Sequence, residues 1–479
     1  MKDFDVLVIG GGLLGCFAAR NLCRWKLHIA LLEAREDVCT GISRANTAIV
    51  YPGYDHKPGT RKAEMCLRAN AGFDALCREL DVPFHRCGSL MVSFGERADE
   101  VLRKKYENGR SMGVPGLRLL TGEEAAAMEP GLAAGVTAAL YAPGAGTVNP
   151  WQLGIAACEN AAANGAALCL NTRVLGIRRT AEGYRIETDR ETFSCRAVIN
   201  CAGLHADRVQ ELLFPASVRI APDAADYLIL DKATENKPTH IIQYEPENDD
   251  KGFNAVPTLE GSLLLGPSER ENEVDTAVSA EGLSFVREQA GRVLPGLDLK
   301  DTIRSFAAVR PNPQRADGSS IGSFVIENPG PGFWSLIGIK TPGLTCANEL
   351  GRYVAERVAA ALCAEENTAF DPRRPGIRRV RGLALSRRAA LVRENADYGE
   401  ILCRCEDVTK AEVLEAIRRG AVSVDGVKRR VGTGMGRCQG SRCERAVMEL
   451  LAEMLSIPVT AVRKDGVGSE ILKGGHGEN

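Results

Sequence analysis

The apolar positions at the start of the chain form two short runs separated by an amphipathic stretch. Residues 5–9 (DVLVI) have the pattern of a buried β-strand, 13–23 have the spacing of a helix, and 28–32 form a second apolar strand. The alternation returns later, with a helix expected at 151–164 and a strand at 167–170. Strands that alternate with helices in this way predict an α/β fold with a parallel sheet.

Three glycines and one acid occupy the turns of the first strand–helix–strand unit. Gly10, Gly12 and Gly15 form the pattern G-x-G-x-x-G, and Glu33 follows the second strand. In a dinucleotide-binding fold the first glycine makes the turn and the second lets backbone N–H groups approach a pyrophosphate. The third lets helix and strand pack closely, and the acid accepts hydrogen bonds from ribose. The complete unit predicts a dinucleotide site, although it does not separate FAD from NAD.

A second glycine fingerprint after a strand is absent from the sequence. The segment GAGTVNP at 144–150 leads from a loop into the helix expected at 151–164. A flavoprotein with a single dinucleotide site has no bound nicotinamide to receive its electrons, so they must leave by another route.

Four cysteines near the C-terminus have the spacing of ligands. Cys403 and Cys405 form a Cys-x-Cys pair, and Cys438 and Cys443 form a Cys-x4-Cys pair. Structural zinc sites favour two to four residues between both paired ligands, so this pattern is unusual for zinc. Two thiolate-bearing loops can also hold a compact iron-sulfur cluster, with zinc or a degenerate site as the alternatives. Short helices are expected at 409–419 and 444–455.

A stretch rich in proline and arginine precedes these cysteines. Prolines and seven arginines between 370 and 388 disfavour a buried core segment, and we interpret 370–399 as a linker. Solvation is the default for such a run of charge, and docking of the small domain or of a partner subunit is the alternative.

The composition narrows the function classes. The chain has 479 residues, 44% hydrophobic and 25% charged, with a formal charge of −2, so a nucleic-acid partner is disfavoured. No apolar run reaches the roughly 18 residues that a transmembrane helix needs, and no signal peptide opens the chain. Most of the sixteen cysteines are scattered through apolar segments, which fits a reducing compartment. A cytoplasmic protein is expected, with peripheral membrane association only through a partner.

The sequence resembles the D-amino-acid-oxidase type of FAD-dependent oxidoreductase, in its glycerol-3-phosphate dehydrogenase-like and L-2-hydroxyglutarate dehydrogenase-like branch. The resemblance rests on the fingerprint and on several further segments. They are SRANT at 43–47, VNP at 148–150, CAG at 201–203, VPTLEGSLLLGPS at 256–268, SFAAVRP at 305–311 and IGIKTPGLTCANELG at 337–351.

The resemblance implies a fold and a domain plan. A Rossmann-like FAD-binding domain of class α/β would be joined to a discontinuous α+β substrate domain and to a small helical iron-sulfur domain. The FAD-binding domain would comprise 1–88, 145–215 and 305–369, and the substrate domain 89–144 and 216–304. The stretch 400–457 resembles bacterioferritin-associated-ferredoxin-like 2Fe-2S domains, and 458–479 would be a tail.

The family likeness also implies ligands for the two cofactors. The cluster would be held by Cys403, Cys405, Cys438 and Cys443. The FAD would be contacted by Ser43, Arg44, Ala45, Asn46, Thr47, Val174, Gly203, Gly343, Leu344 and Thr345, besides the fingerprint residues. A helix that begins after Pro342 would direct its N-terminus at the flavin and stabilise an anionic reduced ring. Lys428, Arg429 and Arg430 would either offset the charge of the cluster or form a solvated basic turn.

Three residues are candidates for the chemistry. Arg310, at a strand end, would anchor a carboxylate or phosphate through a bidentate fork, and Lys340 would reach the flavin or the substrate anion. At position 51 the hydroxy-acid dehydrogenase relatives carry a histidine, and here the residue is Tyr51, a poor base near pH 7. Either Tyr51 orients the substrate while His56 or Lys340 acts as the base, or the substrate is an amine that needs no strong base.

These inferences predict an FAD-dependent dehydrogenase that oxidises a small anionic alcohol, glycerol 3-phosphate or a 2-hydroxy acid. Electrons would pass from the flavin through the 2Fe-2S cluster to a second flavoprotein or a quinone-linked subunit. The alternatives are an amine or imino-acid dehydrogenase subunit of the opine, proline or glycine type, and an electron-transfer subunit without its own substrate.

Overall fold

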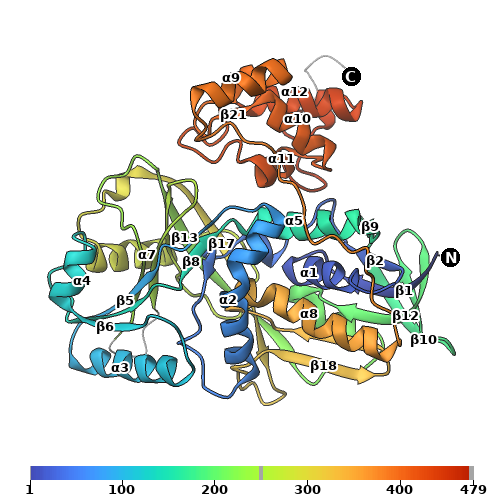
Figure 1. Ribbon diagram of the computed structural model, residues 1–479, viewed down its shortest axis with the longest axis horizontal. Helices are drawn as coiled ribbons and strands as arrows, with labels where there is room; N and C mark the ends of the chain where they lie inside the picture. Colours follow the sequence, from blue (N-terminus) through green and yellow to red (C-terminus); the bar gives the residue numbers. More distant parts are fainter. Residues whose placement is uncertain (1, 247–251, 474–479) are drawn as a thin grey trace. The chain divides into compact units, whose positions relative to one another are not determined.

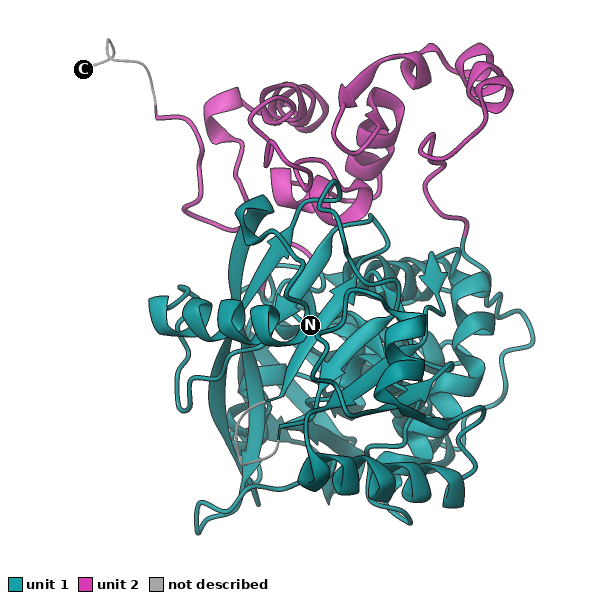
Figure 2. Ribbon diagram, turned by 90° about the vertical axis from the view of Figure 1, so that its left-hand side faces the viewer, with its two compact units in different colours: residues 1–34, 38–374 teal, residues 35–37, 375–479 magenta. Residues whose placement is uncertain are grey.

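The computed structural model describes residues 2–246 and 252–473. The chain divides into two compact units, 1–34 with 38–374 and 35–37 with 375–479, which Figure 2 colours separately. The last six residues of the predicted tail lie outside the described residues. Each unit is described by itself below.

An eight-stranded sheet forms the centre of the first unit (Figure 1). Its strands are β1 (Lys2–Ile9), β2 (Ile29–Leu32), β9 (Ala167–Cys169), β10 (Val174–Arg179), β11 (Tyr184–Thr188), β12 (Thr192–Asn200), β18 (Val325–Gly330) and β19 (Phe333–Ile337). β1 lies between β12 and β2, and both neighbours run parallel to it. β2 pairs with β9 and β12 pairs with β19, also in parallel, so the predicted α/β fold with a parallel sheet is confirmed.

Helices cover the sheet because its central strands are apolar on both faces. α1 (Leu13–Leu22) packs against α5 (Pro150–Ala163) and α8 (Gly343–Ala361), and α8 also contacts α2 (Arg61–Leu80). Their apolar side chains form one large core with β1 and β2.

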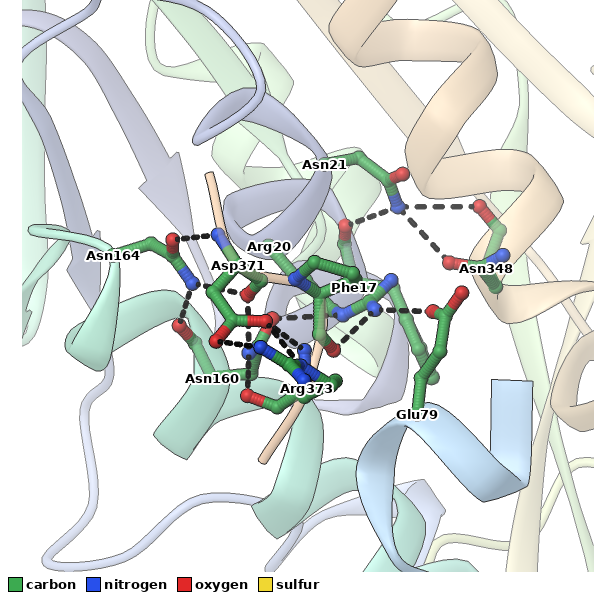
Figure 3. Close-up of polar contacts among 10 residues, drawn as sticks. Phe17, Arg20, Asn21, Glu79, Asn160, Asn164, Asn348, Asp371 and Arg373 are labelled. Carbon is green, nitrogen blue, oxygen red and sulfur yellow. Dashed lines mark hydrogen bonds and ion pairs between the residues drawn. The ribbon is translucent and has the colours of Figure 1, made fainter. Parts of the chain in front are cut away.

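A buried arginine helps to anchor the segment 371–373, which follows this helical layer in the chain (Figure 3). Arg20, 1% exposed, donates to Asn160 Oδ1 at 3.0 Å, to Glu79 at 2.8 Å and to the carbonyl of Pro372 at 3.0 Å. Asn160 in turn donates to the carbonyls of Asp371 and Arg373. Residues 371–373, which the sequence analysis assigned to the linker, are therefore anchored in the first unit.

A second eight-stranded sheet, mostly antiparallel, completes this unit in the order β17-β13-β16-β15-β14-β5-β7-β6. Its strands are β5 (Ser89–Ser93), β6 (Arg118–Thr121), β7 (Ala138–Ala142), β13 (Arg219–Leu230), β14 (Ile241–Tyr244), β15 (Phe253–Pro257), β16 (Leu263–Gly266) and β17 (Thr302–Gln314). The helices beside it are α3 (Glu96–Ser111), α4 (Gly122–Met128) and α7 (Ala280–Val293). The strand that carries Arg310 thus belongs to this sheet, although the sequence analysis placed 305–314 with the FAD-binding segments.

Smaller elements connect the two sheets. β3 (Ile49–Val50) and β4 (Phe84–His85) both pair with β8 (Gly146–Val148). α6 (Ala206–Glu211) follows β12 after a single 3-10 turn.

The second unit is small and mostly helical. It contains α9 (Leu385–Glu394), α10 (Lys410–Arg418), α11 (Val424–Val431), α12 (Glu444–Leu455) and the hairpin of β20 (Ile401–Cys403) with β21 (Val408–Thr409). Its own apolar core includes Val413, Val427, Val447 and Leu451. The helices expected at 409–419 and 444–455 are confirmed, and the structure adds α9 inside the segment interpreted as a linker.

Candidate functional site

The glycine turn after β1 brings backbone atoms into close contact. A Cβ atom at Gly15 would lie 1.8 Å from the carbonyl oxygen of Gly10, so a larger residue here would push α1 away from the turn. Gly12 is the residue before α1, and a Cβ there would lie 3.2 Å from Ser43 Oγ.

Glu33 and Ser43 hold this turn from two sides. Glu33 Oε2 accepts from the N–H of Gly11 at 2.6 Å, and Ser43 Oγ accepts from the N–H of Leu13 at 3.0 Å. The Glu33 carboxylate follows β2, where its second oxygen can accept from a ribose hydroxyl.

Among the described residues, two helix N-termini in this unit have no acidic residue in their first turn and no capping side chain at the residue before the helix. These are α1, where Ser43 instead accepts from the N–H of Leu13, and α8. α2, α5 and α7 each have a side-chain cap. A helix N-terminus without cap or acid keeps its positive end for an anionic ligand, which fits a pyrophosphate at α1 and the pyrimidine edge of a flavin at α8.

The predicted flavin-lining segment is held by local hydrogen bonds, and the strand after it is bonded to α8. Within 43–47, Asn46 closes a local turn by accepting from the N–H of Ala48 at 2.8 Å, and the carbonyl of Arg44 accepts from Trp151 Nε1. After β3, the N–H of Tyr51 donates to Thr345 Oγ1 at 3.0 Å. Thr345 belongs to the first turn of α8, as do Gly343 and Leu344.

Tyr51 lies where two apolar cores meet. It packs against the core of the first sheet and against a second cluster that includes Tyr227 and Phe306 of β13 and β17. Burial raises the pKa of Tyr51 to about 12. Its hydroxyl therefore stays protonated near neutral pH, as the sequence analysis expected of a poor base.

Arg310 has unsatisfied donors. Its Nε and Nη2 atoms are buried without a hydrogen-bond partner in 2–246 and 252–473, and the nearest acid, Glu269, lies 3.6 Å from Nη2. Buried guanidinium donors are costly to leave unpaired, so Arg310 is suited to bind an anion.

One lysine is connected to the strand that carries this arginine. Asn312, two residues after Arg310 on the same face of β17, accepts from Lys340 Nζ and donates to Asp223. Burial and then the charge of Lys340 lower the pKa of Lys62, a residue of α2 that was not singled out from the sequence.

His56 and Cys66 form a further polar group beside Tyr51. Cys66 Sγ lies 3.5 Å from the carbonyl oxygen of Tyr51, and the neighbouring Cys346 and His56 lower the pKa of Cys66. The Nε2 atom of His56 is buried without a hydrogen-bond partner within the described segments. His56 is thus available for a ligand, as one of the two bases that the sequence analysis considered.

The two remaining FAD candidates lie at the ends of strands of the first sheet. Val174 begins β10 and packs against an apolar cluster, while Gly203 follows β12 in a turn with φ +60°.

The four C-terminal cysteines are arranged as two pairs. Cys405 and Cys438 have sulfur atoms 3.6 Å apart, and the neighbouring Cys443 lowers the pKa of Cys403. Two thiolates on one tetrahedral ion at roughly 2.3 Å would lie about 3.8 Å apart, so the spacing of Cys405 and Cys438 suits two ligands of one metal ion. In the described chain, no group of three or more His, Cys, Asp or Glu residues is arranged to hold a single metal ion.

The loops of these cysteines approach closely. A Cβ at Gly436 would lie 2.5 Å from Cys405 Cβ, so this position needs glycine. After Cys443, the backbone groups of Gly434 and Glu406 lower the pKa of Cys403, since they stabilise its thiolate. Cys403 and Cys443 are buried, whereas Cys405 and Cys438 are half-buried.

The predicted basic turn at 428–430 is neither solvated nor aimed at the cysteines. Arg429 and Arg430 are buried, and both donate to Asp37, at 3.1 Å and 2.8 Å. Residues 35–37 belong to the second unit, so this is an internal ion pair of that unit.

Comparisons with known proteins give matches over most of the chain. Residues 5–357 match the family model described as "FAD dependent oxidoreductase", and 401–453 match "BFD-like [2Fe-2S] binding domain". A glycerol 3-phosphate dehydrogenase of Caloramator mitchellensis is 39% identical over 480 residues, which covers 98% of both chains. The human mitochondrial L-2-hydroxyglutarate dehydrogenase is 29% identical over 56% of this chain and 61% of its own length.

The fold is also similar to solved structures. Dithionite-reduced L-alpha-glycerophosphate oxidase from Mycoplasma pneumoniae, with FAD bound, superposes with a TM-score of 0.72 and 24% identity over 78% of this chain and 99% of that one. In the described residues no helix is long and apolar enough to cross a membrane.

Proposed function

Because the chain belongs to the FAD dependent oxidoreductase family, we propose that it oxidises glycerol 3-phosphate and passes the electrons through its own 2Fe-2S cluster to a partner. The expected cofactors, FAD and a 2Fe-2S cluster, are confirmed by the two family matches, and so is the expected class of enzyme, an FAD-dependent dehydrogenase. The substrate, the electron route and the site residues belong to the proposal.

The unsatisfied guanidinium of Arg310 is the observation that carries the assignment of an anionic substrate. Glu269 lies 3.6 Å from Arg310, and Lys340 is linked to Asp223 through Asn312, so each cation has an acid nearby. The free donors of Arg310 suit a phosphate or a carboxylate, and the similarity to a glycerol 3-phosphate dehydrogenase favours the phosphorylated alcohol.

The bound FAD supplies a hydride acceptor at flavin N5. In our proposal the fork of Arg310 binds the phosphate, and this fixes the position of the substrate carbon relative to that acceptor. The uncapped N-terminus of α8 stabilises negative charge at the pyrimidine edge. Tyr51 orients the substrate as a hydrogen-bond donor, and His56 or Lys340 accepts the proton of the hydroxyl group.

Anaerobic bleaching of the flavin tests the substrate directly. We expect glycerol 3-phosphate to reduce the flavin at concentrations at which L-2-hydroxyglutarate, lactate, proline and an opine do not. Reduction by proline or the opine alone would instead support an amine or imino-acid dehydrogenase. This is the second candidate because an amine substrate needs no strong base, and Tyr51, with a pKa raised to about 12, is a poor one. Reduction by none of them until a partner is added would support an electron-transfer subunit.

Replacement of Tyr51 by phenylalanine tests its role. Since burial raises its pKa to about 12, Tyr51 does not titrate between pH 6 and 10. It therefore cannot cause kcat/KM to rise or fall with pH in that range, that is, produce a limb of the pH profile. We expect kcat/KM to fall by about tenfold or less, the worth of roughly one hydrogen bond, with the shape of the pH profile unchanged. Loss of a limb in the variant would show that Tyr51 is the base.

A further inference from the structure

Three arginines are sequence neighbours of the cysteines. Arg404 lies between Cys403 and Cys405, and Arg437 and Arg442 each precede a cysteine of the second pair. All three are exposed, and none forms an ion pair within the described parts of the chain. We call Arg404, Arg437 and Arg442 the arginine rim. Two of the three, Arg404 and Arg437, are next in sequence to the half-buried cysteines, Cys405 and Cys438.

An apolar segment is fixed next to this rim. Arg381 donates to Glu406 at 2.7 Å, and Arg388 pairs with Asp407, so both ends of 381–388 are attached to the residues directly after Cys405. Between these attachments Leu385 is 84% exposed and Leu383 is 36% exposed.

The helix α9 begins inside this segment, at Leu385, and buries none of its side chains, although it contacts the turn at 396–399 and its Arg388 pairs with Asp407. Its N-terminus has neither a side-chain cap nor an acidic first turn among the described residues. Its N-terminal end adds positive potential on the side of Leu385. A helix without a buried face, with an exposed leucine at its start, is typical of a surface that another molecule covers.

From these features we propose that the arginine rim and Leu385 form the docking surface for an acidic one-electron acceptor protein. The proposal rests on the proposed electron route, because it assigns the partner of the same cluster. Cationic and apolar groups in one patch match a partner with a carboxylate-rich rim, and complementary charge mainly accelerates the encounter. In each transfer the reduced cluster would lose one electron and the acceptor would gain it. With a haem protein as acceptor, one ferric haem becomes ferrous, and no bond or proton changes.

The test uses two haem proteins of opposite charge as acceptors, cytochrome b5, which is acidic, and cytochrome c, which is basic. The full-length protein is reduced with dithionite, so the result does not depend on the identity of the substrate. We expect the triple variant Arg404→Glu/Arg437→Glu/Arg442→Glu to reduce cytochrome b5 about tenfold or more slowly at low salt and cytochrome c faster. Both differences should shrink as salt is added.

A binding measurement and a matched control separate docking from other effects. Calorimetry of the oxidised protein with cytochrome b5 should show weaker, less salt-dependent binding for the triple variant. Leu385→Ser should weaken binding severalfold at all salt concentrations. Arg178, Arg373 and Arg418 are exposed and already paired with acids, so their triple replacement by glutamate makes the same change in net charge and should leave both rates near wild type.

Two results would overturn the proposal. One is equal, salt-independent reduction of both cytochromes by the wild type and the rim variant. The other is a shift in cluster potential, measured by electron paramagnetic resonance, that accounts for the whole rate change while binding stays the same. If dithionite-reduced protein behaves as expected but no substrate bleaches the flavin, the docking surface stands and the proposed substrate falls.

Discussion

Replacing Arg310 by methionine is expected to lower kcat/KM for glycerol 3-phosphate by about 10³-fold without destabilising the protein. The loss combines two charge-assisted hydrogen bonds, each worth roughly 1.5–3 kcal/mol, with poorer alignment of the substrate. The stability should hold because the buried Nε and Nη2 atoms of this half-buried side chain have no hydrogen-bond partner in the described chain, and the ion pair with Glu269 at 3.6 Å is weak. Steady-state kinetics and thermal unfolding of the same preparation measure both quantities.

A second substitution at this position distinguishes binding from a structural role. Arg310→Lys keeps the charge but loses the planar fork, so we expect an intermediate loss of about 10- to 100-fold, mainly in KM. If Arg310 served only to pair with Glu269, both variants would lower the melting temperature and the substrate affinity would change little. That pattern would remove the basis of the phosphate assignment.

Local sequence patterns predicted the dinucleotide-binding part of the site. The unit from Gly10 to Glu33 is contiguous, and its residues contact one another within one strand–helix–strand unit. The spacing of its glycines and its acid was therefore enough to predict this local structure. The two short helices between and after the cysteine pairs were predictable for the same reason.

Long-range packing explains what the sequence did not show. Arg429 and Arg430 looked like a solvated turn, but their partner Asp37 lies 393 positions from Arg430 in the chain. The strand run at 302–314 does not reveal to which sheet it belongs, because its pairing with β13 is fixed only in three dimensions. Lys62 was missed since no motif marks it, and α9 was hidden by its arginine-rich composition, which resembles that of a linker.

Serine in place of Cys405 or Cys438 is expected to separate the two halves of the reaction. Each substitution removes one ligand of the half-buried pair, so the purified protein should lose stoichiometric iron and acid-labile sulfide. Flavin reduction by substrate should continue at a rate within about twofold of the wild type, because that step needs only the first cofactor. Reduction of cytochrome b5 should fall to the detection limit, as no one-electron relay remains.

Two other cysteines provide comparisons for the Cys405 and Cys438 variants, one from the buried pair and one from outside the two pairs. Cys403 and Cys443 belong to the apolar core of the second unit, so Cys403→Ser should also destabilise that unit by about 1–3 kcal/mol, the cost of an unpaired buried hydroxyl. Cys363 is exposed and lies outside the two pairs, and Cys363→Ser should leave iron content and both rates unchanged. Zinc in place of iron in the wild-type protein, or full cytochrome b5 reduction by Cys405→Ser, would contradict the assignment of the cluster as the route by which electrons leave the enzyme.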